Sequence, residues 1–324
     1  MPHDAEMNDL PPVALRTADL LAAGLDDRFL RRRAEKGEIT RVVRGRYIGS
    51  DVWNSLDDRE RYCLRIRETV RGLNANVVVS HQSAAAFWAF PVLDRWPTAV
   101  EVLDPARSQF GRTRTLVRRP GGNTADVVTS GDIRVTSAAR TAVDVALTSD
   151  FVVAVMVFDQ GLRAGLFDVG QPAALLEQRR DAQRWRAASL ALRMASPLAE
   201  SPGESISRAM IHCLGFPAPG LQETFADRRG VIGRVDFWWP ETGLVGEFDG
   251  AAKYLDPVLR NGRTADQVVL AEKKRADRLR ALPHVRDVVR WDYATARNAE
   301  RLASVLLGAG LRQQKTRFRQ MKIA

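Results

Sequence analysis

Cysteine and histidine are scarce in this chain of 324 residues. The cysteines, Cys63 and Cys213, lie far apart and outside any CxxC pattern, so neither a disulfide framework nor a structural zinc site is expected. The histidines are His3, His81, His212 and His284. They form no cluster with ligand spacing, and each is interpreted as a structural or exposed residue.

Long apolar runs are also missing. The most apolar stretch, residues 151–158, is far below the roughly 18 residues that a membrane-spanning helix needs, and it predicts a buried helix instead. Residues 1–12 are polar and acidic, and they lack the charged start and apolar centre of a signal peptide. Neither an internal repeat nor a low-complexity tract is evident. We therefore expect a cytoplasmic protein without a membrane partner.

Positive charge, in contrast, is abundant. The 49 Lys and Arg exceed the 39 Asp and Glu, which gives a net charge of +10 and a pI near 10.2. This balance favours an anionic partner such as nucleic acid. The chain is longer than a usual single domain, and its hydrophobic fraction of 45% is ordinary for globular protein, so we expect two or three domains with cores of their own.

Carboxylates mark the two strands of a predicted hairpin. Asp236 opens the apolar run 237–239, which a Pro-Glu-Thr-Gly turn ends. After the second strand begins at residue 244, the two-residue period places Glu247 and Asp249 on one face. Carboxylates that converge on one strand face repel one another unless a cation offsets them. The pattern favours a Mg²⁺ or Mn²⁺ site suited to phosphodiester hydrolysis, and the alternative is that these acids are solvated strand ends.

Further motifs accompany these acids. They are Ser201–Ser205, Arg234–Asp236, Glu247–Gly250, Lys253–Tyr254, Glu272–Leu279 and Val288–Trp291. With them, residues 201–311 resemble the PD-(D/E)xK nuclease superfamily, and most of all its branch related to the very-short-patch-repair endonucleases. The resemblance implies a restriction-endonuclease-like α/β fold with a Glu204 that faces the metal site. Ser201 and Glu204 are also a helix cap with its reciprocal partner, and capping alone is a sufficient reason for Glu204.

One position departs from the superfamily pattern. Two residues after the second-strand acid, where the pattern has a lysine, this chain has Asp249. The ammonium group at that position would orient the attacking water and stabilise charge on the phosphate. Lys253 and Lys273 are the candidates to supply this positive charge. The alternative is a nuclease fold that has lost catalysis.

The N-terminal segment predicts a winged helix-turn-helix. Helices are expected at residues 17–22 and 26–36, and strands at residues 39–43 and 46–48. Residues 28–46 contain eight basic and two acidic side chains. The expected DNA contacts are Arg28, Arg31 and Arg32 on the second helix, with Arg44 and Arg46 on the wing. The alternative is a solvated basic helix that packs on the next domain.

Several short motifs in this segment carry a second resemblance. They are Gly24-Leu25, Arg31-Arg32-Arg33, Lys36-Gly37 and the run Arg41–Tyr47. With them the segment resembles the winged-helix domain of AbiEi-type abortive-infection antitoxins, whose members repress their own operons. The resemblance implies DNA binding, and an antitoxin role would add a cognate toxin as a protein partner.

The middle region predicts a mixed α+β fold. Its elements are expected at residues 77–79 (a buried strand), 80–90 and 136–146 (capped helices) and 118–131 (turns between strands). His81, Ser83 and Asp144 can be combined on paper into a hydrolase site. No nucleophile elbow accompanies them, so they are interpreted as packing and capping residues.

Two basic segments complete the chain. A helix over residues 172–194 is expected to link the middle region to the nuclease-like domain, and its arginines either follow a DNA backbone or are solvated. The tail from Arg312 to Lys322 has five basic residues and no acid, so we expect it to add non-specific phosphate affinity.

These patterns predict a multi-domain α/β protein. The expected parts are a winged helix-turn-helix (1–75), an α+β middle domain (76–170), a basic linker helix (171–200), a nuclease-like domain (201–312) and a basic tail (313–324). The leading hypothesis is metal-dependent cleavage or nicking of DNA, in which Asp236 and Glu247 hold the metal and Asp249 assists. The alternative is a transcriptional regulator or antitoxin whose nuclease fold serves as a binding scaffold.

Overall fold

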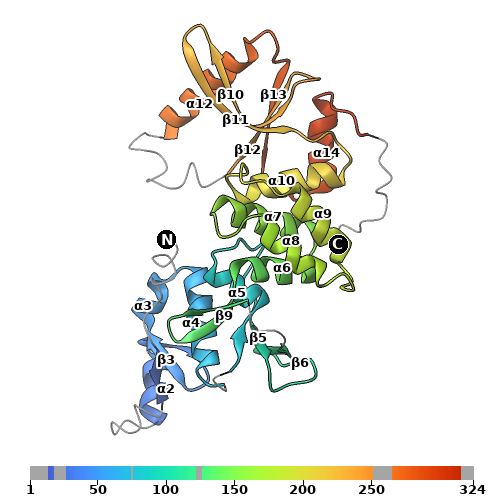
Figure 1. Ribbon diagram of the computed structural model, residues 1–324. Helices are drawn as coiled ribbons and strands as arrows, with labels where there is room; N and C mark the ends of the chain where they lie inside the picture. The colour runs from blue at the N-terminus through green and yellow to red at the C-terminus, as the bar shows by residue number, and fades with distance from the viewer. Residues whose placement is uncertain (1–13, 18–26, 74–75, 122–125, 251–264, 315–324) are drawn as a thin grey trace. The chain divides into compact units, whose positions relative to one another are not determined.

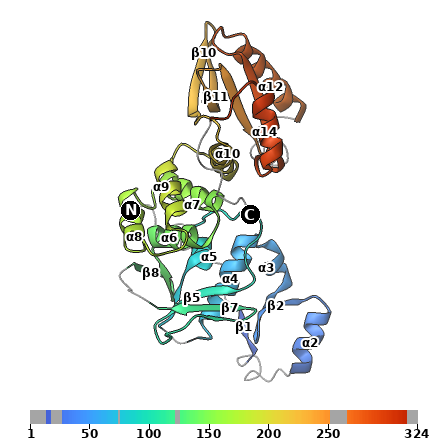
Figure 2. The ribbon, with the colours of Figure 1, turned by 90° about the vertical axis from the view of Figure 1, so that its right-hand side faces the viewer.

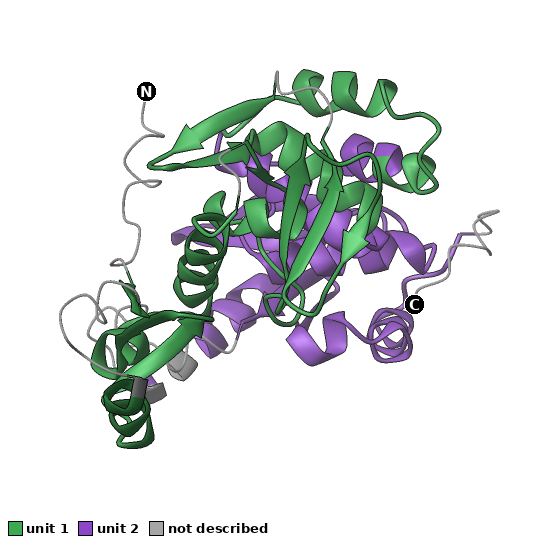
Figure 3. Ribbon diagram, turned by 90° about the horizontal axis from the view of Figure 1, so that it is seen from below, with its two compact units in different colours: residues 1–148, 166–188 green, residues 149–165, 189–324 purple. Residues whose placement is uncertain are grey.

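The computed structural model describes residues 14–17, 27–73, 76–121, 126–250 and 265–314 (Figure 1). The chain divides into two compact units, which Figure 3 colours separately. Unit 1 comprises Met1–Thr148 and Leu166–Ala188, and unit 2 comprises Ser149–Gly165 and Ser189–Ala324. Both units contain helices and strands, in agreement with the multi-domain α/β class expected from the sequence.

Six elements open unit 1. They are β1 (Leu15–Arg16), α2 (Asp27–Glu35), β2 (Ile39–Val43), β3 (Arg46–Gly49), α3 (Ser50–Ser55) and α4 (Asp58–Val70). The strands form an antiparallel sheet in the order β1-β3-β2. Val42 and Ile48 of this sheet pack with Leu64 of α4 in a buried cluster. Helix α4 therefore covers one face of this sheet.

The second helix and the wing strands occur close to the residues expected for them. On α2, Leu30 is only 4% exposed, whereas the Arg28, Arg31 and Arg32 side chains are exposed. This is the amphipathic pattern of a helix with one face on a core. The helix expected at residues 17–22 falls almost wholly on residues 18–26, which lie outside the described residues.

A six-stranded sheet forms the rest of unit 1. Its elements are β4 (Val78–Val79), α5 (His81–Phe87), β5 (Val100–Asp104), β6 (Gly111–Arg112), β7 (Leu116–Pro120), β8 (Val127–Ser130), β9 (Ile133–Thr136), α6 (Ala138–Thr148) and α8 (Gly170–Glu177). The strand order is β6-β7-β5-β4-β9-β8, with β4 parallel to β9 and β5 parallel to β7. Helix α5 packs on β5 and β9, α6 packs on α5, and α8 packs on α6 (Figure 2). The expected strand and the two helices of the middle region are present: the strand and the first helix are shorter than expected, and the second helix is shifted by two residues. Ser80 precedes α5 without a side-chain capping bond.

The single helix expected over residues 172–194 is wrong. The chain forms two helices there, α8 and α9 (Trp185–Met194), with turns between them. The Trp185 indole Nε1 donates to the Leu176 carbonyl at 3.0 Å, and Arg179 Nη1 donates to the Leu175 carbonyl at 3.1 Å. These side chains bond carbonyl groups that a continuing helix would have bonded itself, so they end α8.

Unit 2 is built around a four-stranded sheet. Its elements are α7 (Phe151–Arg163), α10 (Pro202–Cys213), β10 (Gly220–Asp227), β11 (Gly230–Trp239), β12 (Leu244–Asp249), α12 (Ala265–Arg280), β13 (Asp287–Asp292), α13 (Tyr293–Ala296) and α14 (Ala299–Gly308). The order is β10-β11-β12-β13, antiparallel except for the parallel pair β12 and β13. The hairpin predicted around the acids is therefore confirmed as β11 and β12.

Helix α10 covers one face of this sheet. The Phe237 ring stacks on Trp291 with centroids 5.2 Å apart, and the Trp291 indole donates to Ser207 Oγ of α10 at 2.8 Å. The approach is closest at Gly203, where a Cβ atom would lie 2.0 Å from the Phe248 ring. Only glycine allows helix and strand to come this close.

The opposite face packs on α12. Val245 and Val288 belong to a buried cluster with Leu279 of α12. Glu247 lies on the same face as Val245, whereas Phe248 lies against α10. The alternation predicted along the second strand is thus present, and it places Glu247 beside α12.

Helix α7 contains the apolar run 151–158 and is buried, as expected. Its Asp159 is 0% exposed and accepts hydrogen bonds from the Ser196 backbone N–H at 2.7 Å and from Arg208 Nη1 at 2.6 Å. Because Arg208 belongs to α10, this buried ion pair ties α7 to the helix that covers the sheet.

Among the described residues, no helix is both long and apolar enough to cross a membrane. Two parts of the chain to which the sequence analysis gave a role, Lys253 and the basic tail from residue 315 onward, lie outside the described residues.

Candidate active site

Asp236 and Glu247 lie on neighbouring strands at the point where the β11–β12 pairing ends. The last regular pair on this side is Phe237 with Gly246, so Asp236 and Glu247 are the next residues along the two strands. Asp236 Oδ2 accepts a hydrogen bond from the Phe248 backbone N–H at 2.8 Å. The carboxylate takes the place of a backbone acceptor, which fixes Asp236 against β12 beside Glu247.

Glu204 has two roles in the structure. As the helix-capping interpretation predicts, Ser201 Oγ accepts from the Glu204 N–H at 3.2 Å. The same hydroxyl donates to Glu204 Oε1 at 2.7 Å, where the capping motif predicts a bond from the Ser201 backbone N–H. Glu204 Oε2 accepts from the Glu200 N–H at 2.9 Å and also from Gln222 Nε2 at 3.0 Å. Glu204 is only 7% exposed, so this cap is buried beside β10. Capping and contact with the acidic site are therefore compatible.

Gln222 connects the two acids, and sequence reasoning missed it. Its amide Nε2 lies 3.0 Å from Glu204 Oε2 and 3.4 Å from Asp236 Oδ1. Its backbone φ is +54°, and the β10–β11 register omits it, passing from Leu221 to Glu223. A non-glycine residue in the left-handed region costs about 1–3 kcal/mol, and such strain concentrates at functional sites. Glutamine carries no sequence signal for this conformation, so only the structure reveals it.

Glu247 is 7% exposed and is held by two arginines. Arg275 Nη1 on α12 donates to Oε1, and Arg290 Nη2 on β13 lies 2.8 Å from Oε2. Arg290 Nη1 also donates to Glu272 Oε2 at 3.0 Å. A buried carboxylate costs several kcal/mol unless such partners offset it. Burial opposes the charge of Arg290, but Glu247, Glu272 and Asp249 outweigh this effect and raise the Arg290 pKa.

A glycine lets Arg275 reach the site. Gly233 on β11 has a φ of +143°, and a Cβ atom there would lie 3.0 Å from Arg275 Nε. Arg275 Nη2 also donates to the Arg234 carbonyl. The guanidinium therefore bridges β11 and Glu247 of β12. The sequence placed Arg275 on a basic helix and Arg290 in the last strand, but it assigned neither to the site.

The remaining predicted site residues lie differently. Asp249 ends β12 and is half-buried, and its neighbour in the parallel register is Asp292. Lys273 is exposed on α12, and among the described residues no contact joins it to the acids. The cations observed beside Glu247 are Arg275 and Arg290 instead.

The donor chemistry of the site fits a hard divalent cation. Within the described ranges, no three His, Cys, Asp or Glu side chains gather closely enough to hold a metal ion. Mg²⁺, however, usually takes one or two protein carboxylates and keeps several waters. Asp236 and Glu247, one from each of two adjacent strands, are such a pair. Their oxygens accept hydrogen bonds from Gln222, Phe248 and the two arginines.

The predicted DNA contacts of unit 1 are mostly exposed. Those with exposed side chains are Arg28, Arg31, Arg32 and Arg44. Arg46 differs, because its side chain is 12% exposed and its Nε lies 3.5 Å from Oε2 of the buried Glu68 on α4. Arg46 therefore attaches the wing strand to the helix behind it, and the other four arginines face solvent.

Comparison with known proteins adds little to this geometry. No family model matches the chain, and no curated protein matches it. Among solved structures, the RV2827C protein from Mycobacterium tuberculosis is similar with a TM-score of 0.37 and 18% sequence identity, over 67% of this chain and 84% of that one.

Proposed function

We propose that this chain is a DNA-binding protein that cleaves or nicks DNA with the carboxylates of unit 2. The observation that carries the proposal is the set Glu204, Asp236 and Glu247 at one end of the sheet, in which Glu204 and Glu247 are buried and a strained Gln222 joins Glu204 to Asp236. Buried carboxylates and backbone strain at one place are costly for stability, and proteins retain them mainly at functional sites.

Each side chain has a role in this proposal. Asp236 and Glu247 would hold Mg²⁺ or Mn²⁺, which supplies a Lewis acid and an activated water when bound. Glu204 acts through Gln222, which keeps Asp236 in its orientation. Arg275 and Arg290 bind the phosphate of the DNA and bear the charge that develops on it, the task that lysine performs in the superfamily pattern.

The exposed arginines of unit 1 bring the substrate to this site. The N-terminal elements resemble a winged helix-turn-helix, in which a helix enters the major groove and the wing contacts the backbone. Helix α2 offers Arg31 and Arg32 to solvent, and the turn before β3 offers Arg44. A guanidinium group can form paired hydrogen bonds with two phosphate oxygens, so arginines at these positions are suited to contact the DNA backbone.

Cleavage of a supercoiled plasmid tests the proposal directly. The full chain, with Mg²⁺ or Mn²⁺, is expected to nick or linearise the plasmid. Asp236→Asn keeps an acceptor for the Phe248 N–H but removes a charge, and Glu247→Gln does the same between the arginines. Each is expected to slow cleavage about a hundredfold or more, since a metal ligand supplies several kcal/mol. Glu241→Gln, an exposed acid in the same hairpin, is the matched control.

A second function is favoured by one specific observation. Both oxygens of Glu247 are held by arginines, and Asp249 stands where the superfamily has lysine. These contacts neutralise the site within the protein, as suits a nuclease fold retained as a scaffold in a transcriptional regulator or antitoxin. No cleavage by any of the four proteins, with DNA binding intact, would favour this function over the first.

Fluorescence anisotropy separates the two functions further. A regulator is expected to prefer one promoter-like duplex over a scrambled one, and a general nuclease is not. In both cases the double variant Arg31→Ala/Arg32→Ala should lower the slope of log affinity against log salt by about two, because each phosphate contact contributes about 0.9. Arg95→Ala, an exposed arginine elsewhere in unit 1, is the control. An unchanged slope in the double variant would remove α2 from the DNA interface.

A further inference from the structure

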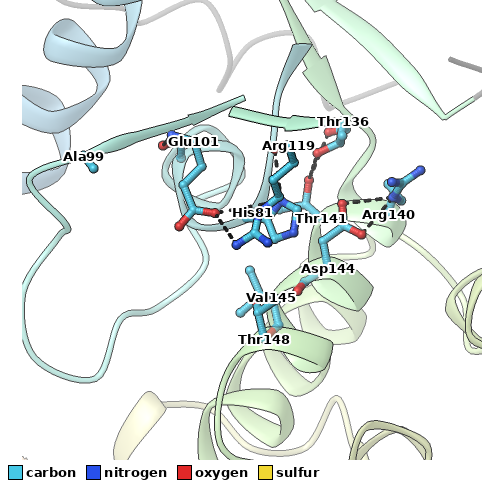
Figure 4. Close-up of polar contacts among 12 residues, drawn as sticks. His81, Ala99, Glu101, Arg119, Thr136, Arg140, Thr141, Asp144, Val145 and Thr148 are labelled. Atoms are coloured by element: carbon cyan, nitrogen blue, oxygen red, sulfur yellow. Dashed lines mark hydrogen bonds and ion pairs between the residues drawn. The ribbon is translucent and has the colours of Figure 1, made fainter. Parts of the chain in front are cut away.

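A second cluster of charged side chains lies within unit 1, around His81 (Figure 4). Its members are His81 at the start of α5, Glu101 of β5, Arg119 of β7, Arg140 and Asp144 of α6, and Arg179 after α8. Figure 4 shows His81 between Glu101 on one side and Asp144 on the other. The fold therefore brings together residues that are far apart in the sequence and that the DNA-cleavage proposal does not use.

Three arginines of the cluster lie close to the carboxylates of Glu101 and Asp144. Arg140 Nε lies 2.9 Å from each carboxylate oxygen of Asp144, and Arg179 Nη2 lies 4.0 Å from Asp144 Oδ1. On the other side, Arg119 Nη2 donates to Glu101 Oε2 at 3.4 Å. Three guanidinium groups thus share two carboxylates. Burial, and after it the nearby Arg140, lower the pKa of Arg179, whereas Asp144 and Asp126 oppose this shift.

Arg119 is the arginine of the cluster whose hydrogen bonding is incomplete. Its Nε is buried and has no hydrogen-bond partner among the described residues. A buried polar atom without a partner destabilises the fold, and one explanation for such an atom is a bound ion. The side chains of Arg119 and Arg179 are 29% and 23% exposed, so a ligand can reach them from solvent.

His81 forms the buried side of the cluster. It is 7% exposed, and burial lowers its pKa to about 4, with Arg119, Arg140 and Arg179 adding to the effect and Asp144 opposing it. The imidazole is therefore neutral at physiological pH. Its Nδ1 lies 3.0 Å from Ser80 Oγ, and among the described residues no group bonds Nε2. His81 also has a φ of +52°, a strained conformation for this residue.

The cluster is arranged for binding, not for nucleophilic attack. Ser83, the nearest candidate nucleophile, has its hydroxyl occupied: Tyr62 Oη lies 2.7 Å away, and the Glu101 N–H donates to Ser83 Oγ at 2.8 Å. The interpretation of Ser83 as a packing residue therefore agrees with these contacts. His81 and Asp144 differ from Ser83, because both belong to the charged cluster.

We propose that unit 1 contains a phosphate-binding site in which Arg119, Arg140 and Arg179 hold the phosphate oxygens. Planar guanidinium groups bind phosphate in pairs of charge-assisted hydrogen bonds. In the bound state Ser80 donates to Nδ1 of His81, and the Nε2–H donates to the ligand. Asp144 and Glu101 orient the arginines. The site is independent of the carboxylates of unit 2.

Isothermal titration calorimetry of the full chain with pyrophosphate provides the first test. Saturable binding is expected for the wild type. Arg179→Gln removes a guanidinium that donates to the Leu175 carbonyl and lies 4.0 Å from Asp144, and it leaves the tighter Arg140–Asp144 pair intact. Arg119→Lys keeps the charge but loses the planar fork. Each is expected to weaken binding about tenfold or more, the loss of one charge-assisted hydrogen bond. Circular dichroism of both variants should match the wild type.

Arg134→Gln is the matched control. Arg134 lies on β9 of the same sheet and donates to the Asn76 carbonyl at 3.3 Å, outside the cluster. Pyrophosphate affinity in this variant should equal that of the wild type. Equal weakening in Arg134→Gln would reduce the effect to net charge and overturn the site.

Titration with duplex DNA distinguishes the two possible sources of the phosphate. If the ligand is the DNA backbone, Arg179→Gln should lower the salt slope of duplex binding by about one. If the ligand is a free phosphate compound, the slope stays the same and only pyrophosphate binding weakens. The proposal is overturned if neither pyrophosphate affinity nor the salt slope changes in Arg179→Gln and Arg119→Lys.

Discussion

Stability of unit 1 should depend on pH through His81. The imidazole is buried, and its pKa is lowered from 6.5 to about 4. In the unfolded chain the same side chain binds a proton below about pH 6.5, whereas in the folded chain it does not do so until about pH 4. Acidification therefore favours the unfolded state. The free energy of unfolding should fall as the pH decreases from 6.5 to 4, and this group adds no further loss below that range.

The magnitude follows from the two pKa values. A lowering from 6.5 to about 4 corresponds to about 3 kcal/mol when it is fully expressed, and about 2 kcal/mol of this should be lost between pH 7.5 and pH 5. Burial also raises the pKa of Glu101, so this carboxyl group contributes to the pH dependence as well. The difference between the wild type and a variant without the imidazole isolates the contribution of His81.

His81→Asn is the appropriate variant. Asparagine tolerates a positive φ better than most residues, so the backbone at +52° is kept, and its amide does not titrate. Urea unfolding at pH 7.5 and pH 5, read by pulsed hydrogen exchange of α5 and α6 peptides, follows unit 1 by itself. The wild type should lose about 2 kcal/mol more than the variant over this range. Equal losses in both proteins would refute a buried neutral His81.

Three further predictions concern unit 2. Gly203→Ala should lower the free energy of unfolding by about 1–3 kcal/mol in urea, because the new Cβ would lie 2.0 Å from the Phe248 ring; an equally stable variant would contradict this close approach. Asp159→Ala should lower the free energy of unfolding by about 3–5 kcal/mol, because it leaves the 10% exposed Arg208 without its carboxylate partner. Replacing both residues by leucine should recover part of this loss, and no recovery would argue against the ion pair. Gln222→Glu puts a third carboxylate beside Glu204 and Asp236, so urea midpoints should fall at pH 7 and recover toward pH 5; pH-independent stability would show that the three groups are not neighbours.

Local elements of unit 2 were largely predictable from the sequence. The Ser201 cap, the hairpin of β11 and β12 and the buried helix α7 all occur where patterns of a few residues placed them. Capping, turns and two-residue alternation depend on side chains near one another in the chain, so they can be recognised without knowing the fold. The broken helix between α8 and α9 was missed because Trp185 bonds a carbonyl nine positions earlier, outside any helical pattern.

The candidate active site was only half predictable. Asp236 and Glu247 were predicted from strand ends and Glu204 from the resemblance to the nuclease superfamily, and the structure places them at one end of the sheet. Gln222 and Arg275 were not found, because neither follows a local rule. Gln222 contacts the acids through a backbone conformation that its residue type does not favour.

By itself, then, the sequence determined where the acids, the exposed arginines and most helices and strands lie along the chain. The tertiary structure decided which charged side chains contact one another. It turned Arg46 toward the buried Glu68, set Arg275 against Glu247, and brought His81 into one cluster with Asp144. The physical reason is that a charge enters the protein interior only beside a partner that offsets its desolvation. That partner is chosen by the packing of sheets and helices, and no short stretch of sequence contains this information.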